Sequence, residues 1–212
     1  MELVYVADPM CSWCYGFAPV LARAASALPA SVPLRYLMGG LAEDSDEPMP
    51  AATSRMIQGA WNTIERVTSV SFNREFWTRC QPRRSTYPAC RAVIAAEALS
   101  IGAGSAMFSG IQRAYYQEAQ NPSDVPVLAD VAKSIQLSRN DFIKRMLSEK
   151  TETELQKQLR ERARLGVEVG VAGFPALVLK SSDGDVQLLT SGYCSWGELS
   201  PRLEAGLASA GG

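Results

Sequence analysis

The sequence predicts an α/β fold in which a βαβ unit at the start and a ββα unit at the end flank a long helical segment. Residues 2–40 show an apolar run, an amphipathic helical pattern and a second apolar run. Residues 48–166 keep helical periodicity, and strand patterns return only over 175–190. Because neither end piece can bury its own apolar face, we expect the two to form one sheet.

The first unit has clear boundaries. The apolar run 3–7 is followed by turn residues and suits a buried strand. Apolar side chains then recur at i, i+3 and i+4 from residue 14 to 28, and Pro29 ends this helix. Pro19 lies inside the pattern and predicts a kink. The second strand is expected at 33–38, and the βαβ order implies that the two strands are parallel.

Capping residues mark several helix starts in the long middle segment. Asp124 is a candidate cap, and two capping boxes are expected, at Ser138 with Asp141 and at Thr151 with Glu154. Pro88 suits the first turn of another helix. These signals predict several separate helices rather than one long one.

The last unit combines a hairpin and a helix. Strand patterns at 175–180 and 186–190 flank a turn at 182–185 and predict a β-hairpin. Ser195, with Glu198 three residues further on, forms a capping box for a last helix. This helix completes the ββα order.

The composition is that of a globular protein with an ordinary charge balance. The chain has 212 residues, is 47% hydrophobic and 20% charged, and carries a formal net charge of −1. This balance argues against a nucleic-acid groove or a polybasic membrane surface, so we expect no nucleic-acid and no membrane partner. The first basic residue is Arg23, so no signal peptide is visible and a cytoplasmic location is predicted. Removal of a signal peptide would instead indicate the periplasm.

Five cysteines and no histidine limit the chemistry. An odd cysteine count in a chain of this size does not indicate a disulfide scaffold. The absence of histidine excludes His-based acid–base catalysis, His-containing zinc sites and Cys–His nucleophile pairs. Chemistry therefore has to depend on cysteine, carboxylate, lysine, tyrosine or backbone dipoles.

The strongest chemical signal is a CxxC motif, Cys11-Ser12-Trp13-Cys14, placed after a strand at the start of a helix. Two residues between the cysteines bring the sulfurs close enough to form a disulfide. A thiolate on Cys11 would face the positive end of the helix, so Cys11 is the expected attacking group. Cys14, one turn further, is expected to be buried and to resolve mixed disulfides.

Two other interpretations of the motif remain open. Zinc and iron–sulfur sites also use CxxC, but they need further ligands, and no second CxxC and no histidine occur here. The cysteines could also be two core residues, although the polar start of a helix is a poor core position. The sequence thus favours redox chemistry, with no metal and no organic cofactor.

Two segments resemble the DsbA-like branch of the thioredoxin superfamily. The first is Asp8-Pro9-Met10-Cys11-Ser12-Trp13-Cys14-Tyr15-Gly16-Phe17, and the second is Gly173-Phe174-Pro175-Ala176. The resemblance implies a thioredoxin fold, βαβ…ββα, interrupted by an all-helical insertion domain after the second strand. It places the thioredoxin-like domain at 1–42 and 167–212 and the insertion at 43–166.

The resemblance also implies a function and further site residues. It implies a thiol–disulfide oxidoreductase acting on protein or peptide thiols and disulfides, with glutathione as a further candidate partner. Pro175 matches the family's cis-proline, and Gly173, Phe174 and Pro175 would bind substrate. Ser12 and Trp13 would tune the redox pair and resemble the dipeptide of cytoplasmic predicted disulfide isomerases.

The competing function is a glutathione-dependent isomerase or transferase of the same fold. Those relatives typically have serine where Cys11 stands and lack Cys14, so the presence of both cysteines argues against it. A third interpretation is a non-catalytic metal-binding or redox-sensing adaptor. The sequence indicates neither the direction of electron flow nor an oligomeric state.

Several other residues are expected to be structural. Cys80, Cys90 and Cys194 are interpreted as packing residues, although the spacing of the first two permits a disulfide. An aromatic group and an acidic cluster are assigned to the core and to a solvated loop, respectively. These residues are Trp61, Phe76 and Trp77, and Glu43, Asp44, Asp46 and Glu47.

Overall fold

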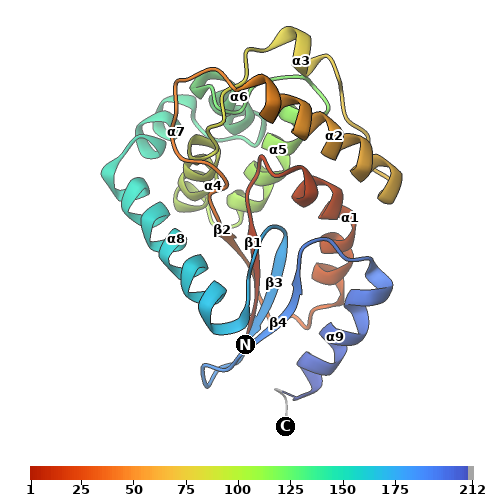
Figure 1. The fold of residues 1–212 in the computed structure, drawn as a ribbon. Coiled ribbons are helices and arrows are strands. Elements are labelled where there is room, and N and C mark those ends of the chain that lie inside the picture. The colour runs from red at the N-terminus through yellow and green to blue at the C-terminus, as the bar shows by residue number, and fades with distance from the viewer. Residues whose placement is uncertain (210–212) are drawn as a thin grey trace.

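The chain folds into a small sheet with helices on both faces and a group of helices at one end (Figure 1). The computed structural model describes residues 1–209. The elements follow in the order β1 (Glu2–Ala7), α1 (Ser12–Ala27), β2 (Leu34–Met38), α2 (Ala51–Val67), α3 (Phe76–Arg79), α4 (Tyr87–Leu99), α5 (Ala103–Tyr116), α6 (Val125–Ser134), α7 (Arg139–Met146), α8 (Glu149–Val169), β3 (Ala176–Lys180), β4 (Val186–Ser191) and α9 (Trp196–Ser209).

The sheet joins the two ends of the chain, as predicted. Its strand order is β2-β1-β3-β4, with β1 and β2 parallel and with β3 antiparallel to both β1 and β4. Tyr5 of β1 therefore lies between Tyr36 of β2 and Leu177 of β3. All seven helices α2–α8 fall between β2 and β3 in the sequence. The expected thioredoxin fold with a helical insertion is thus confirmed.

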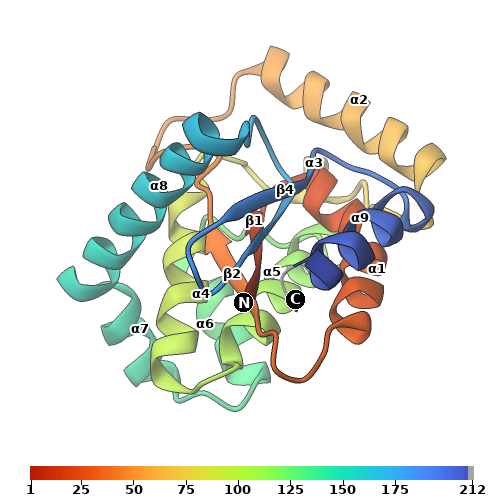
Figure 2. The same cartoon turned by 90° about the horizontal axis from the view of Figure 1, so that it is seen from below.

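The two faces of β1 pack against different helices. Leu3 and Tyr5 point into the larger apolar core, which includes Phe17 of α1. Val4 and Val6 point the other way, into a smaller core that includes Leu165 of α8. Figures 1 and 2 show α1 and α9 on one side of the sheet and α8 on the other. The strand is therefore buried on both faces, which explains its continuous apolar sequence.

Helix α1 ends where the sequence predicts. Its last residue is Ala27, and Leu28 is already extended, because the residue before a proline disfavours the helical conformation. Pro19 lies inside α1, and Cys14 and Phe17 are fully buried on its inner face. This packing fixes the start of α1 firmly against the core.

Two of the three capping boxes are confirmed and one is wrong. The Ser138 side chain accepts the Asp141 amide at the start of α7. At the start of α9, the Glu198 carboxylate accepts the Ser195 amide and the Ser195 hydroxyl accepts the Glu198 amide. Helix α8, however, is capped by Ser148 and not by Thr151, because the Ser148 hydroxyl accepts the Thr151 amide. Asp124 precedes α6 without capping it, because its carboxylate pairs with Arg83 at 2.6 Å.

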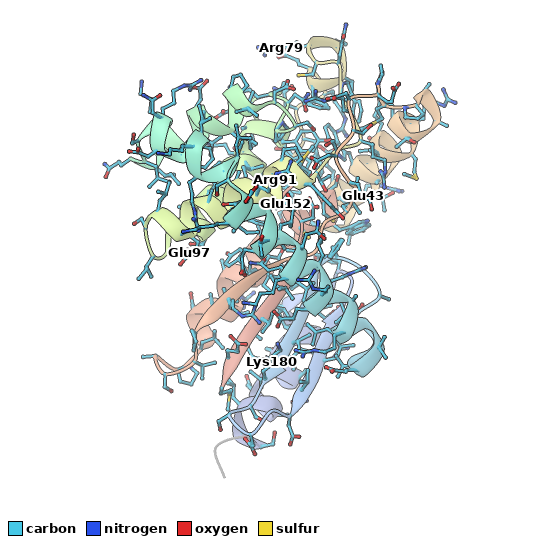
Figure 3. The ribbon with its side chains drawn as sticks, turned by 90° about the vertical axis from the view of Figure 1, so that its left-hand side faces the viewer. Glu43, Arg79, Arg91, Glu97, Glu152 and Lys180 are labelled. Atoms are coloured by element: carbon cyan, nitrogen blue, oxygen red, sulfur yellow. The ribbon has the colours of Figure 1, made fainter. Side chains whose placement is uncertain are left out.

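Part of the acidic cluster contributes to the fold and does not merely solvate a loop. Arg91 of α4 donates to Asp44 in the loop before α2, at 2.6 Å. It also donates to Glu152 at the start of α8, at 3.0 Å, and Figure 3 shows these two side chains adjacent. Arg91 therefore connects α4 to the loop before α2 and to the start of α8, a contact that the sequence pattern does not indicate.

Helix α8 runs past the predicted end of the insertion. It extends to Val169 and packs against β2, so its last turns belong to the packing of the sheet. The division of the chain at residues 42 and 166 stays a prediction. Within residues 1–209, no helix is both long enough and apolar enough to cross a membrane.

A partly buried ion-pair network holds α8 against the sheet and gives a first testable prediction. Glu161 of α8 accepts from Arg35 of β2 at 2.8 Å and from Lys180 of β3, which is labelled in Figure 3. Burial opposes ionisation, but these two cations lower the Glu161 pKa from 4.5 to about 2. We expect Glu161→Gln to reduce the free energy of unfolding by about 2 kcal/mol at neutral pH, since all three side chains are partly exposed.

The pH dependence of the free energy of unfolding distinguishes the loss of these ion pairs from a general destabilisation of the fold. Because the folded-state pKa lies below the ordinary value, the contribution is complete above pH 4.5 and is lost as the pH falls toward about 2. Denaturant titrations of wild type and Glu161→Gln should therefore converge in acid. Glu204→Gln, an exposed carboxylate on α9, serves as the control. A difference that stays constant from pH 7 to pH 2 would contradict the assignment.

Candidate active site

Cys11 occupies the N-cap of α1, at the carboxyl end of the central strand. Its amide donates to the Asp8 carbonyl at 3.0 Å, and its own carbonyl accepts the Tyr15 amide at 3.1 Å. The first turn of α1 holds no acidic residue. A thiolate on Cys11 thus meets the free amides of the helix start, and no carboxylate of that turn competes with it.

Cys14 lies one turn further and is fully buried, whereas Cys11 keeps 7% of its surface exposed. Burial, and after it the neighbouring Cys11 thiol, raises the pKa of Cys14 well above 9.0. The Asp8 amide and the Tyr5 hydroxyl oppose this rise. The two thiols are therefore adjacent but unequal: only Cys11 reaches solvent.

The segment before β3 faces Cys11. The Cys11 sulfur lies 4.0 Å from the carbonyl oxygen of Phe174, and the expected cis bond between Phe174 and Pro175 is present. The Phe174 ring packs against Gly39 after β2, where a Cβ atom would overlap the ring. Glycine at position 39 thus lets Phe174 sit close to the sheet.

A cavity of about 390 Å³ opens over Cys11. It contains five of the seven predicted site residues, while Cys14 and Pro175 do not line it. Its walls come from the start of α1 and the segment before it, from the loop after β2, from α2, α5 and α8, and from the segments before α4 and β3. The lining residues are Met10, Cys11, Ser12, Trp13, Leu41, Met56, Ile57, Ala60, Arg84, Tyr115, Arg162, Ala172, Gly173 and Phe174.

The two residues between the cysteines are each held by an aromatic side chain. Trp61 of α2 donates its indole N–H to the Ser12 hydroxyl at 2.9 Å. The Trp13 ring lies against Tyr193 before α9, with ring centroids 5.7 Å apart. The CxxC turn is thus held by Trp61 of α2 at Ser12 and by Tyr193, in the segment before α9, at Trp13.

Asp8 forms a buried polar centre beside the CxxC loop. Its carboxylate accepts from the Met10 amide at 2.8 Å, the Leu41 amide at 2.7 Å and the Thr86 hydroxyl at 2.6 Å. The Cys90 thiol approaches the same carboxylate at 3.6 Å. Burial raises the pKa of Asp8 above 3.8, and the hydrogen bonds oppose the rise. Asp8 therefore links the active-site loop to the loop after β2 and to α4.

The remaining cysteines are packing residues, as predicted. Cys90 and Cys194 are buried, Cys80 is partly buried, and all three are free thiols. The disulfide that the spacing of Cys80 and Cys90 permits is not formed. Across residues 1–209, no three cysteine or carboxylate side chains are grouped so as to hold a metal ion.

The structure adds residues that the sequence analysis did not assign to the site. Tyr5, Asp8 and Trp61 support the cysteines, while Arg84 and Arg162 line the cavity. Asp8 and Tyr5 lie close to the motif in the sequence, Tyr5 within β1 and Asp8 directly after it, and this proximity was the available signal. Trp61, Arg84 and Arg162 reach the site only through the tertiary fold.

Solved structures share this architecture along nearly the whole chain. A candidate protein disulfide isomerase from Nitrosomonas europaea is 27% identical, with a TM-score of 0.87 and coverage of 98% of both chains. The cytosolic disulfide reductase DsbM of Pseudomonas aeruginosa, solved with GSH, is 28% identical, with a TM-score of 0.75 and coverage of 99% and 98%. At lower identity, structures of DsbA oxidoreductases share the fold.

A curated relative is the ClpXP adapter protein SpxH of Bacillus subtilis (strain 168). It is 24% identical over 170 residues, which cover 80% of this chain and 56% of that protein. The thioredoxin family model matches residues 4–196. The resemblance to the DsbA-like branch is thereby confirmed, and the chain belongs to the thioredoxin family.

Proposed function

We propose that the protein is a thiol–disulfide oxidoreductase in which Cys11 attacks the substrate disulfide and Cys14 releases the product. The observation that carries this proposal is the inequality of the two thiols at one helix start. Cys11 lies at the helix N-cap, at the base of an open cavity, while Cys14 is fully buried behind it. Only the first can meet a substrate sulfur, and only the second is placed to attack Cys11 afterwards.

The reaction is a pair of exchanges that conserves sulfur and electrons. The Cys11 thiolate attacks one sulfur of a disulfide, forms a mixed disulfide and expels the other sulfur as a thiolate. The Cys14 thiolate then attacks the Cys11 sulfur, forms the Cys11–Cys14 disulfide and expels the second substrate thiolate. The substrate gains two electrons and the protein loses two. The reverse sequence regenerates the dithiol from two external thiols.

The segment facing Cys11 supports a role in substrate binding. The Phe174 carbonyl lies beside the Cys11 sulfur, so an extended peptide that reaches Cys11 passes this acceptor. We assign Gly173, Phe174 and Pro175 to substrate binding on this ground. Ser12 and Trp13 are assigned to tuning the pair, because both lie in the turn between the sulfurs.

The relatives support reduction as the direction. DsbM is described as a cytosolic disulfide reductase and was solved with GSH. We propose that this chain also works in a reducing cytoplasm and exchanges electrons with a small thiol such as glutathione. A more oxidising potential, near that of a disulfide donor, would instead indicate the periplasm.

The test is a trapping experiment with a Cys14→Ala variant. Without the resolving thiol, the first mixed disulfide cannot be released internally, so we expect it to accumulate on Cys11. Mass spectrometry after acid quenching measures the trapped fraction, and peptide mapping locates it. Cys90→Ala, which removes another fully buried thiol, is the matched control and should trap nothing. If Cys14→Ala turns over like wild type, the assigned roles are wrong.

A further inference from the structure

Two arginines line the cavity over Cys11, and no acidic residue does. Arg162 comes from α8 and Arg84 from the segment before α4, so the fold brings them to the cavity from separate places. Within residues 1–209, neither guanidinium lies within ion-pair distance of a carboxylate. The cavity is therefore positively charged beside its nucleophile.

The Arg162 guanidinium is held in place by a contact that leaves N–H donors without a hydrogen-bond partner in the part of the chain described. Its guanidinium lies over the Phe174 ring, 5.3 Å from the centroid, which fixes it beside the segment that faces Cys11. Its Nε is buried and has no hydrogen-bond partner in the part of the chain described. The stacking on Phe174 thus holds the guanidinium at the cavity, where a ligand can supply an acceptor for its terminal N–H groups.

Arg84 faces the same space. Tyr115 lines the cavity, and its pKa is raised by burial while the Arg84 charge opposes the rise. The lining also includes two exposed apolar side chains, Met56 at 61% and Leu41 at 39%. The cavity thus combines a reactive sulfur, apolar side chains and two positive charges in a volume suited to a small ligand.

We propose that Arg84 and Arg162 form a carboxylate-binding subsite that selects small peptide thiols and disulfides with negatively charged ends. This inference rests on the proposed function, because it assigns the specificity of the same site. Arginine is suited to this role, since its planar fork pairs with both oxygens of a carboxylate. The ligand places its sulfur at Cys11 and its carboxylates on the arginines.

The reaction with such a ligand is balanced. The Cys11 thiolate attacks the anionic disulfide, forms a mixed disulfide with one half and releases the other half as a thiolate. Cys14 then forms the Cys11–Cys14 disulfide and releases the second half. The arginines take no part in the electron transfer. They raise the occupancy of the site and orient the sulfur.

The experiment compares two disulfides that differ in charge. Glutathione disulfide is the anionic probe and bis(2-hydroxyethyl) disulfide the uncharged one. We expect Arg162→Gln and Arg84→Gln each to lower the ratio of kcat/KM for the anionic over the uncharged disulfide by about tenfold. The change should appear mainly in KM. Arg162→Lys, which keeps the charge but loses the fork, should fall between wild type and Arg162→Gln.

The control lies on the same helix. Arg164→Gln removes one positive charge two residues further along α8, where the side chain is 62% exposed and pairs with Glu168. It should keep the wild-type ratio. If Arg84→Gln and Arg162→Gln also keep that ratio while wild type reduces both probes, the subsite is wrong and the proposed function stands. If wild type reduces neither probe, the proposed function itself fails.

Discussion

We expect a Cys11→Ser variant to reduce no disulfide above the uncatalysed rate, a loss on the order of 10³-fold or more. A serine hydroxyl fits the same N-cap position but cannot form a disulfide with a substrate sulfur. The neighbouring Cys14 cannot replace it, because Cys14 is fully buried and its pKa is raised well above 9.0. Reduction of a model peptide disulfide, followed by chromatography, measures the loss.

A substitution at another cysteine is the control for this prediction. Cys80→Ser removes a partly buried cysteine that does not line the cavity and should keep wild-type activity. Full activity of Cys11→Ser would show that the order of attack is wrong. Conjugating activity with glutathione in Cys11→Ser would instead favour the transferase interpretation, since serine stands at this position in the relatives of that type.

Much of the fold could be predicted because its signals are local. The strands, the first helix and the hairpin are each set by apolar periodicity and by residues such as Pro29 that end an element. The CxxC motif is also local, so the cysteines could be named from sequence, whereas Pro175 and the segment opposite them are named through the resemblance to the DsbA-like branch. The error at Thr151 is local too: Ser148, three residues earlier, offers an equally good cap.

The contacts that hold the active-site residues in place could not be predicted from the sequence, because they join segments that are far apart along the chain. Trp61 meets Ser12 across 49 positions, and the Asp8 carboxylate meets Thr86 across 78. Periodicity indicates that Trp61 is buried but not which hydroxyl its indole reaches. Arg162 likewise lies in a charged stretch with Arg160, Glu161 and Arg164, and only the packing of α8 beside Phe174 places it at the cavity.

The second large effect is expected at Trp61, where the core and the active site meet. Trp61 is fully buried. The centroid of its ring lies 4.7 Å from that of the stacked Phe72 ring and 5.8 Å from that of the Tyr115 ring. Truncation to alanine leaves a large cavity between α2 and its neighbours. We expect Trp61→Ala to lower the free energy of unfolding by about 3–5 kcal/mol, measured by denaturant titration. A loss below about 1 kcal/mol would contradict this burial.

A double-mutant cycle separates the role of Trp61 in the core from its contact with the CxxC turn. Trp61→Phe keeps most of the ring but removes the indole N–H that Ser12 accepts at 2.9 Å, and Ser12→Ala removes the acceptor. If this bond stabilises the turn, the two changes together should cost less than the sum of the single changes, with a coupling of about 1 kcal/mol. The same cycle, read through the reduction potential of Cys11 and Cys14, tests whether the insertion acts on the redox pair. If the changes are additive in both the free energy of unfolding and the reduction potential, Trp61 acts only as a core residue. If they are coupled in both, the contact between Trp61 and Ser12 transmits the packing of α2 to the redox pair.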